Sequence, residues 1–311
     1  MNRKNWSIFF DSAANNKKVV AAHAMSGVIV ISATVAFSSL IALYFGLDVF
    51  HLFERFQGLV FLKSKGLIIS SALVVSIALL CARIYQVFLE ARVVTDREKW
   101  FAEKLRREGA LAGANVSRAS NYYGRLSSAS MKAASTTLLL IISFFIMAFL
   151  LPFDYLLGVV AFLLVCSTGL YFIMQLLSVH MSNASRGLSE HGKKMALWKM
   201  NGSESYSVEV DAYYKSYFNR IMISSIFGLT PAVFSFLLCI VMVIIQEFGL
   251  LDFGFKEVFL ALILLQSYVG IMGKFFGSFV QAAAFLPAIR CCFEDGHLPV
   301  KMEPYDDAEG Y

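Results

Sequence analysis

Charged residues are scarce in this sequence. Asp, Glu, Lys and Arg make up 16% of its 311 residues, whereas soluble domains carry about 25%. Hydrophobic residues reach 58% and gather in long runs, which indicates an integral membrane protein rather than a soluble one. The net charge is +5, but the basic residues stand in blocks between the apolar runs. That arrangement favours control of membrane topology over nucleic-acid binding.

Cysteine is also sparse, and its five residues do not form a disulfide framework. Three of them lie within apolar runs, and Cys291 and Cys292 are neighbours that would not bridge comfortably. We interpret them as free thiols that fill the core. No spacing typical of a metal site and no Ser/His/Asp or Cys/His constellation is present. The sequence therefore predicts neither a catalytic residue nor a metal or cofactor bound by this chain.

Six apolar runs are each long enough for the roughly 20 residues that a helix needs to cross a bilayer. They cover residues 19–47, 66–89, 133–151, 155–179, 221–245 and 255–279. The first run follows basic residues without a cleavage site, so it is expected to be a retained helix rather than a signal peptide. We predict an all-α membrane protein with a six-helix domain over residues 19–293. Cytoplasmic segments at 1–18 and 294–311 are expected on the same side of the membrane.

Lys and Arg predict the orientation of these helices. The N-terminal segment, the second and fourth connections and the C-terminal tail together hold 21 of the 27 basic residues. The opposite side holds only Arg55, Lys63, Lys65 and Lys256. By the positive-inside rule the richly basic side is cytoplasmic, which predicts a multi-pass protein of the bacterial cytoplasmic membrane.

The helices are expected to leave the membrane on the cytoplasmic side. Residues 86–107 contain good helix formers and neither Pro nor Gly, so the second run can continue to about residue 108. Such a helix would be about 64 Å long, whereas the bilayer core is only about 30 Å thick. The fourth run can continue towards Ser189, and the fifth can begin near Val208. Two cytoplasmic tips are predicted, near residues 109–125 and 190–204.

These features resemble the transmembrane domain of type I ABC exporters. In that family, coupling helices at two cytoplasmic tips dock into ATPase domains. At the first tip, Gly113 and Arg118 match a Gly and an Arg five residues apart, while Tyr122 stands where the family has Asp. After the sixth run, Arg290 takes the place of the Arg that ends the family's small-residue helix.

The second tip carries the same resemblance. Glu190, Lys199 and Glu204 reproduce the family's spacing of Glu, Lys and Glu, although Lys194 replaces a small residue. Trp198 adds apolar bulk at a tip far from lipid, which favours a protein contact over a merely solvated loop. The resemblance implies that both tips bind a separate ATPase subunit. It also implies a homodimer, or a heterodimer with a similar chain.

The sequence contains a near-match to a phosphate-binding loop, formed by Gly187, Gly192 and Lys193. Such a loop needs Ser or Thr after its Lys to reach Mg²⁺ and must join a strand to a helix, but Lys194 follows here at the end of a helix. The chain also has no room for an ATPase domain after its sixth run. ATP and Mg²⁺ are therefore expected only on the partner ATPase.

The polar residues inside the spans are candidates for a substrate cavity. Lys274 in the sixth run is a charge that either contacts an anionic substrate or extends to the interface, and Arg83 presents the same choice. Gln266, Tyr268 and Gln175 are the other candidates. A cavity with so few polar groups favours an amphipathic, lipid-like or peptide substrate over a sugar or an ion.

Three functions remain open on the sequence. The first is the membrane subunit of an exporter that works by alternating access and is driven by the ATPase subunit. The second is a proton-driven transporter of the same fold, against which stands the lack of a carboxylate well within a span. The third is a non-transporting regulatory or immunity-type membrane protein, which the departures at Tyr122 and Lys194 leave open.

Overall fold

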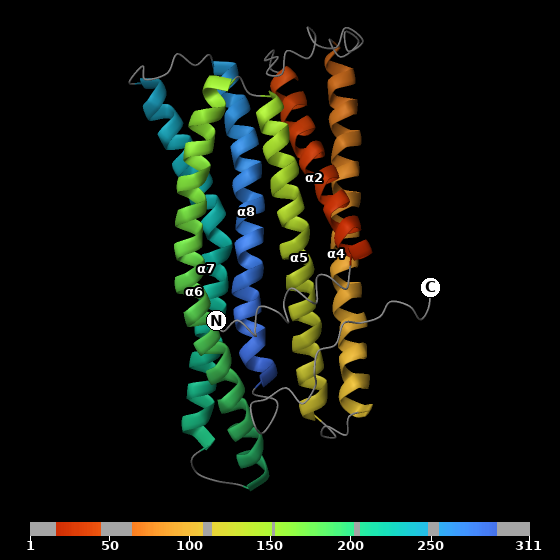
Figure 1. Ribbon diagram of the computed structural model, residues 1–311, viewed down its shortest axis with the longest axis vertical. Coiled ribbons are helices and arrows are strands. Elements are labelled where there is room, and N and C mark those ends of the chain that lie inside the picture. Colours follow the sequence, from red (N-terminus) through yellow and green to blue (C-terminus); the bar gives the residue numbers. More distant parts are fainter. Residues whose placement is uncertain are drawn as a thin grey trace.

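A computed structural model describes residues 17–44, 64–107, 114–150, 153–201, 206–247 and 255–290, and the regular structure in these ranges is entirely helical. The helices run lengthwise, nearly side by side (Figure 1). They are α2 (Lys17–Tyr44), α4 (Lys65–Arg107), α5 (Ala114–Leu150), α6 (Phe153–Asn201), α7 (Tyr206–Glu247) and α8 (Phe255–Arg290).

The prediction of long apolar helices is confirmed. Within the described residues, five helices are long and apolar enough to cross a membrane, judged by length and composition, which fits a multi-pass membrane protein. They are α2, α4, α5, α6 and α8. The predicted fifth run lies within α7, several of whose side chains fall outside the described set. The continuous second helix is confirmed as well, because α4 spans 43 residues.

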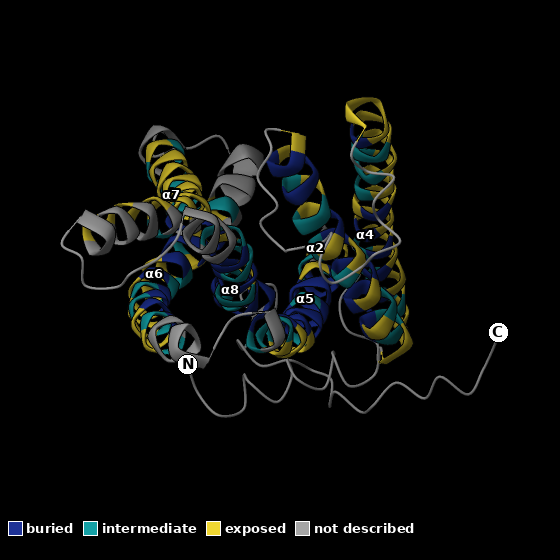
Figure 2. Cartoon of the chain, turned by 90° about the horizontal axis from the view of Figure 1, so that it is seen from above, coloured by how far each residue is buried: buried dark blue, intermediate teal, exposed yellow. Residues whose placement is uncertain are grey.

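Seen from above, the helices form two groups (Figure 2). One group consists of α2, α4 and α5, and the other consists of α6, α7 and α8. Among the described helices, the contact between α5 and α8 is the most extensive and joins the two groups. Exposed side chains dominate the outer faces of α4, α6 and α7, whereas α5 and α8 carry most of the buried positions. The core therefore follows the α5–α8 seam.

The C-terminal half of α4 and the N-terminal half of α5 form an arm that extends beyond the start of α2 (Figure 1). Its core contains Phe101, Leu105 and Leu126, which are completely buried, and it continues into α8 through Ile289. The ring of Tyr123 stacks on Phe101 with centroids 4.4 Å apart. An aromatic and aliphatic core of this kind holds the two helices together.

Two glycines allow the helices of this group to approach closely. A Cβ atom at Gly124 of α5 would lie 2.5 Å from the backbone oxygen of Val94 in α4. A Cβ atom at Gly27 of α2 would lie 2.5 Å from Leu139 Cδ1 of α5. Both distances are far shorter than a van der Waals contact, so only glycine fits at these crossings without a shift of the neighbour.

The helices reach further into the predicted tips than expected. α5 already begins at Ala114, and α6 continues to Asn201, so Glu190 lies within a helix rather than at a turn. The connections at 108–113 and 202–205 lie outside the described residues. Good helix formers such as Met195, Ala196 and Leu197 explain the extension of α6, because each adds a backbone hydrogen bond at little conformational cost.

Candidate functional site

The exposed side chains in the described part of α8 are all polar. Among the described side chains of this helix, only Gln266, Lys274 and Gln281 are exposed, and they lie on one face together with Gly270. We call this set the polar face of α8. A Cβ atom at Gly270 would meet no other atom within 4 Å, so the space beside it is open. The face therefore differs from the apolar outer faces of α4, α6 and α7, whose exposed residues include Val87, Phe172 and Phe236.

A network of polar side chains joins α2, α4 and α5 at the inner end of the apolar segments. The carboxylate of Glu90 accepts a short ion-pair contact from Lys132, with Nζ 2.7 Å from Oε2. Its other oxygen lies 3.4 Å from Nε2 of His23. The second ring nitrogen of His23 lies 2.9 Å from the Ser135 hydroxyl. His23 is buried, so this network ties three helices together through groups that have partners.

Two further cations belong to the same region. Arg83 lies two turns before Glu90 on α4 and donates a hydrogen bond to Gln86 Oε1 at 3.3 Å. Lys274 of α8 is within the electrostatic range of Arg83, Glu90 and Lys132. We call His23, Arg83, Glu90, Lys132 and Lys274 the polar cluster. Four helices contribute to it, and it contains three Lys or Arg side chains and one carboxylate.

The predicted cavity residues do not converge on one place. Gln266 and Lys274 share the polar face of α8, but Tyr268 is turned about 120° away from Lys274 around the helix. Tyr268 instead lines an apolar pocket of about 310 Å³ with Phe144, Met272 and other residues of α5, α6 and α8. Gln175 is exposed on α6, where its amide donates a hydrogen bond to the Tyr171 hydroxyl at 3.0 Å.

The predicted docking residues of the first tip are only partly described. Gly113 lies outside the described residues, and Arg118 is exposed on the first turns of α5. The guanidinium of Arg118 reaches α6, because its Nη1 would lie 3.8 Å from a Cβ atom at Gly192. The ring of Tyr122 stacks on Phe285 of α8 at 6.3 Å between centroids, so its contacts here are made within the chain.

At the second tip, Glu190 is exposed on α6. Trp198 and Lys199 belong to the last turns of α6, but their side chains lie outside the described set, as does the whole of Glu204. The near-match to a phosphate-binding loop is part of the same helix. A Cβ atom at Gly187 would lie 2.8 Å from the Ser216 hydroxyl of α7, so this glycine serves a close contact between helices.

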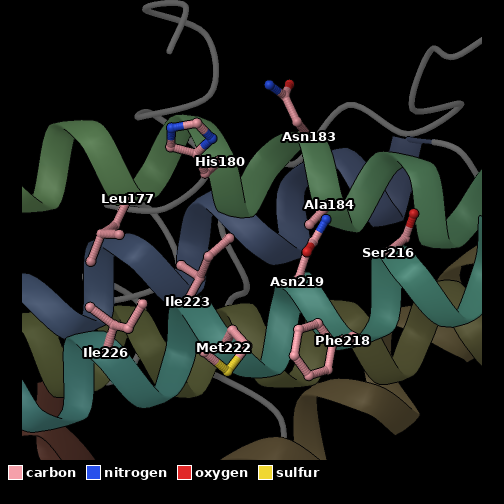
Figure 3. A pocket seen from close by; sticks show the side chains of 10 residues that line it. All are labelled: Leu177, His180, Asn183, Ala184, Ser216, Phe218, Asn219, Met222, Ile223 and Ile226. Carbon is pink, nitrogen blue, oxygen red and sulfur yellow. The ribbon is translucent and has the colours of Figure 1, made fainter.

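A groove of about 650 Å³ between α6 and α7 was not predicted (Figure 3). Its polar groups are His180 and Asn183 from α6 and Ser216 and Asn219 from α7. The rest of its lining is mainly apolar and consists of Leu177, Ala184, Phe218, Met222, Ile223 and Ile226. In sequence these residues look like ordinary positions of two amphipathic helices, because only the pairing of α6 with α7 brings them together.

The sequence interpretation also missed the network around Glu90. Glu90 directly follows the second apolar run, and His23 and Lys132 lie at the inner ends of two others. All three residues lie at the same end of their apolar runs, and this shared position could have suggested a contact. Their pairing, however, depends on which helices are neighbours. Among the described residues, no group of three His, Cys, Asp or Glu side chains is placed to hold a metal ion.

No model of a known protein family matches this chain, and a search of curated proteins finds no match either.

Proposed function

We propose that this chain is the membrane-spanning subunit of an exporter that is driven by a separate ATPase. The observation that carries the proposal is the length of the helices. α4, α5, α6 and α7 have 43, 37, 49 and 42 residues, and α6 alone measures about 74 Å. The apolar bilayer core accounts for only about 30 Å of that length.

The excess length forms two arms on the side that is rich in Lys and Arg. One arm is the inner part of α4 and α5, and the other is the inner part of α6 and α7 (Figure 1). Arg118 of the first arm reaches Gly192 of the second, so the two ends lie near each other. A partner that holds both ends can transmit its own movement along stiff helices to the membrane segment, which is the mechanical requirement of alternating access. A dimer of such chains would enclose the substrate path.

Co-purification from native membranes tests this proposal. The full chain is expected to bring down a subunit that hydrolyses ATP. The combined substitutions Glu190→Lys, Trp198→Ala and Glu204→Lys should lower its recovery at least tenfold, because they change the end of the second arm. ATP hydrolysis in the eluate and the amount of partner per chain are the measurements. Asp96→Lys, a single charge reversal at an exposed position further from the tips, is the control.

One observation favours a second candidate, a proton-driven transporter without an ATPase. Glu90 directly follows the second apolar run and contacts Lys132 and His23, so this half-buried carboxylate is a candidate for proton transfer at that end of the spans. Uptake into proteoliposomes driven by a pH gradient alone, abolished in Glu90→Gln, together with no ATPase in the eluate, would replace the first proposal by the second.

A further inference from the structure

The polar face of α8 is not a surface for lipid. α8 has the largest buried share among the helices that qualify as membrane spans, and its exposed described side chains are two glutamines and a lysine. Side chains that face hydrocarbon are apolar, since a charge there costs about 2.5–3.5 kcal/mol. The face therefore looks onto a space that holds water or a polar ligand. The open surroundings of Gly270, one turn from Lys274, show that there is room for one.

The charges around this space are unbalanced. Glu90 is the carboxylate of the polar cluster, and Lys132 already pairs with it at 2.7 Å. Arg83 has Gln86 as its hydrogen-bond partner, and Lys274 has no ion pair within the described part of the chain. Two cations from opposite helix groups thus face the same region with no carboxylate of their own. Such cations attract an anion strongly where nearby apolar helices exclude water.

Apolar surface continues from this region towards the other end of the helices. The face of α2 that carries His23 continues through Phe37 and Ile41, both of which are exposed. α2 also contacts α8, so an elongated molecule with its head at Lys274 has an apolar wall for its tail. A small inorganic anion would leave that wall unused.

We infer that Arg83 and Lys274 bind the anionic head group, a phosphate or carboxylate, of an amphiphile whose tail lies along Gly270 and α2. Glu90 holds Lys132 in place and limits the site to a single anionic group. As the substrate site of an exporter, this assignment rests on the proposed function. Binding of the amphiphile is a property of this chain and is measured without any ATPase. The anion site and the ATPase-driven export can therefore fail independently of each other.

Binding of dodecyl phosphate to the full chain in phosphatidylcholine nanodiscs is the test. We expect Lys274→Gln and Arg83→Gln each to weaken binding by about tenfold, the equivalent of one charge-assisted hydrogen bond. Lys274→Arg should retain binding because it keeps the charge. Lys215→Gln and Arg186→Gln remove exposed cations of α7 and α6 and should change the affinity less than twofold. Added salt should weaken binding to the native chain.

Two further probes separate the sources of the head group. If phosphatidylglycerol in the nanodisc competes with dodecyl phosphate, the ligand is a bilayer lipid. If it does not compete, the ligand is an amphiphile that reaches the site separately from the bilayer lipids. Both results support the anionic site. Equal binding of dodecyltrimethylammonium, or unchanged affinity in both Lys274→Gln and Arg83→Gln, would refute it. Equally tight binding of inorganic phosphate alone would refute the role of the tail.

Discussion

At the scale of single residues, Glu90 shows how position changes the meaning of a charge. In sequence it is one of several acidic residues in a long basic helix. In the structure its two oxygens contact Lys132 of α5 and His23 of α2, while Asp96 and Glu103 on the same helix are exposed. A half-buried carboxylate with two partners stabilises a helix arrangement, because losing it leaves a cation without a partner in an apolar setting.

Reversal of the Glu90 charge tests this role. Glu90→Lys places two lysines together and should lower the stability of the α2–α4–α5 group by about 1–3 kcal/mol. The double variant with Lys132→Glu restores opposite charges and should recover most of the loss. The apparent melting temperature, followed by size-exclusion chromatography after heating, is the measurement. Glu103→Lys, an exposed change on the same helix, should remain within about 0.5 kcal/mol; a similar loss in that control would show that Glu90 has no special part.

At the scale of elements, α4 shows how the spacing of buried residues predicts the extent of a helix. Its buried residues recur every four positions through Leu89, Val93, Arg97, Phe101 and Leu105, far past the end of the apolar run. This spacing lets α4 pack against its neighbours beyond that run, so the helix continues there. No sequence pattern predicts the close crossing at Gly124. An isolated Gly in a helix is equally consistent with a position that merely destabilises the helix.

Gly124→Ala tests that crossing. The new methyl group would meet the Val94 backbone oxygen at 2.5 Å, and a backbone atom cannot rotate away. The crowding should cost about 1–3 kcal/mol, partly offset by the higher helix propensity of Ala, about 1 kcal/mol. Gly228→Ala in α7, where nothing lies within 4 Å, is the matched control and should be neutral or stabilising. Melting temperatures compare the two, and equal values would show that α4 and α5 separate without strain.

At the scale of the whole molecule, the helices extend furthest at the end where the basic connections lie. The ends of α4 near Arg107 and of α6 near Asn201 adjoin the basic connections, whereas α4 begins at Lys65 on the side with few basic residues. The positive-inside rule then predicts that the two arms are cytoplasmic.

Cysteine labelling decides the orientation. In a background without the five native cysteines, Ser64→Cys should react with a membrane-impermeant thiol reagent in intact cells. Arg107→Cys should react only after permeabilisation, because α4 carries it to the other side. Both positions are exposed, so access to the reagent is limited by the membrane alone. The reverse pattern would place the arms outside and exclude a cytoplasmic ATPase as their partner.

The long helices follow from the sequence alone. Apolar runs longer than a bilayer requires, helix formers beyond their ends and the rarity of Pro predict six long helices without knowledge of any neighbour, because backbone hydrogen bonding and hydropathy act locally. The sequence also placed Lys274 and Gln266 on one helix and predicted that Gly187 to Lys193 is not a phosphate-binding loop.

Which residues meet depends on the tertiary fold. It placed Tyr268 in an apolar pocket between α5, α6 and α8, turned Tyr122 onto Phe285, and brought Glu90, Lys132 and His23 together from three helices. The rotation and pairing of long helices depend on how their surfaces pack together, and single glycines can set a crossing. The hydrophobicity of a run does not specify these contacts.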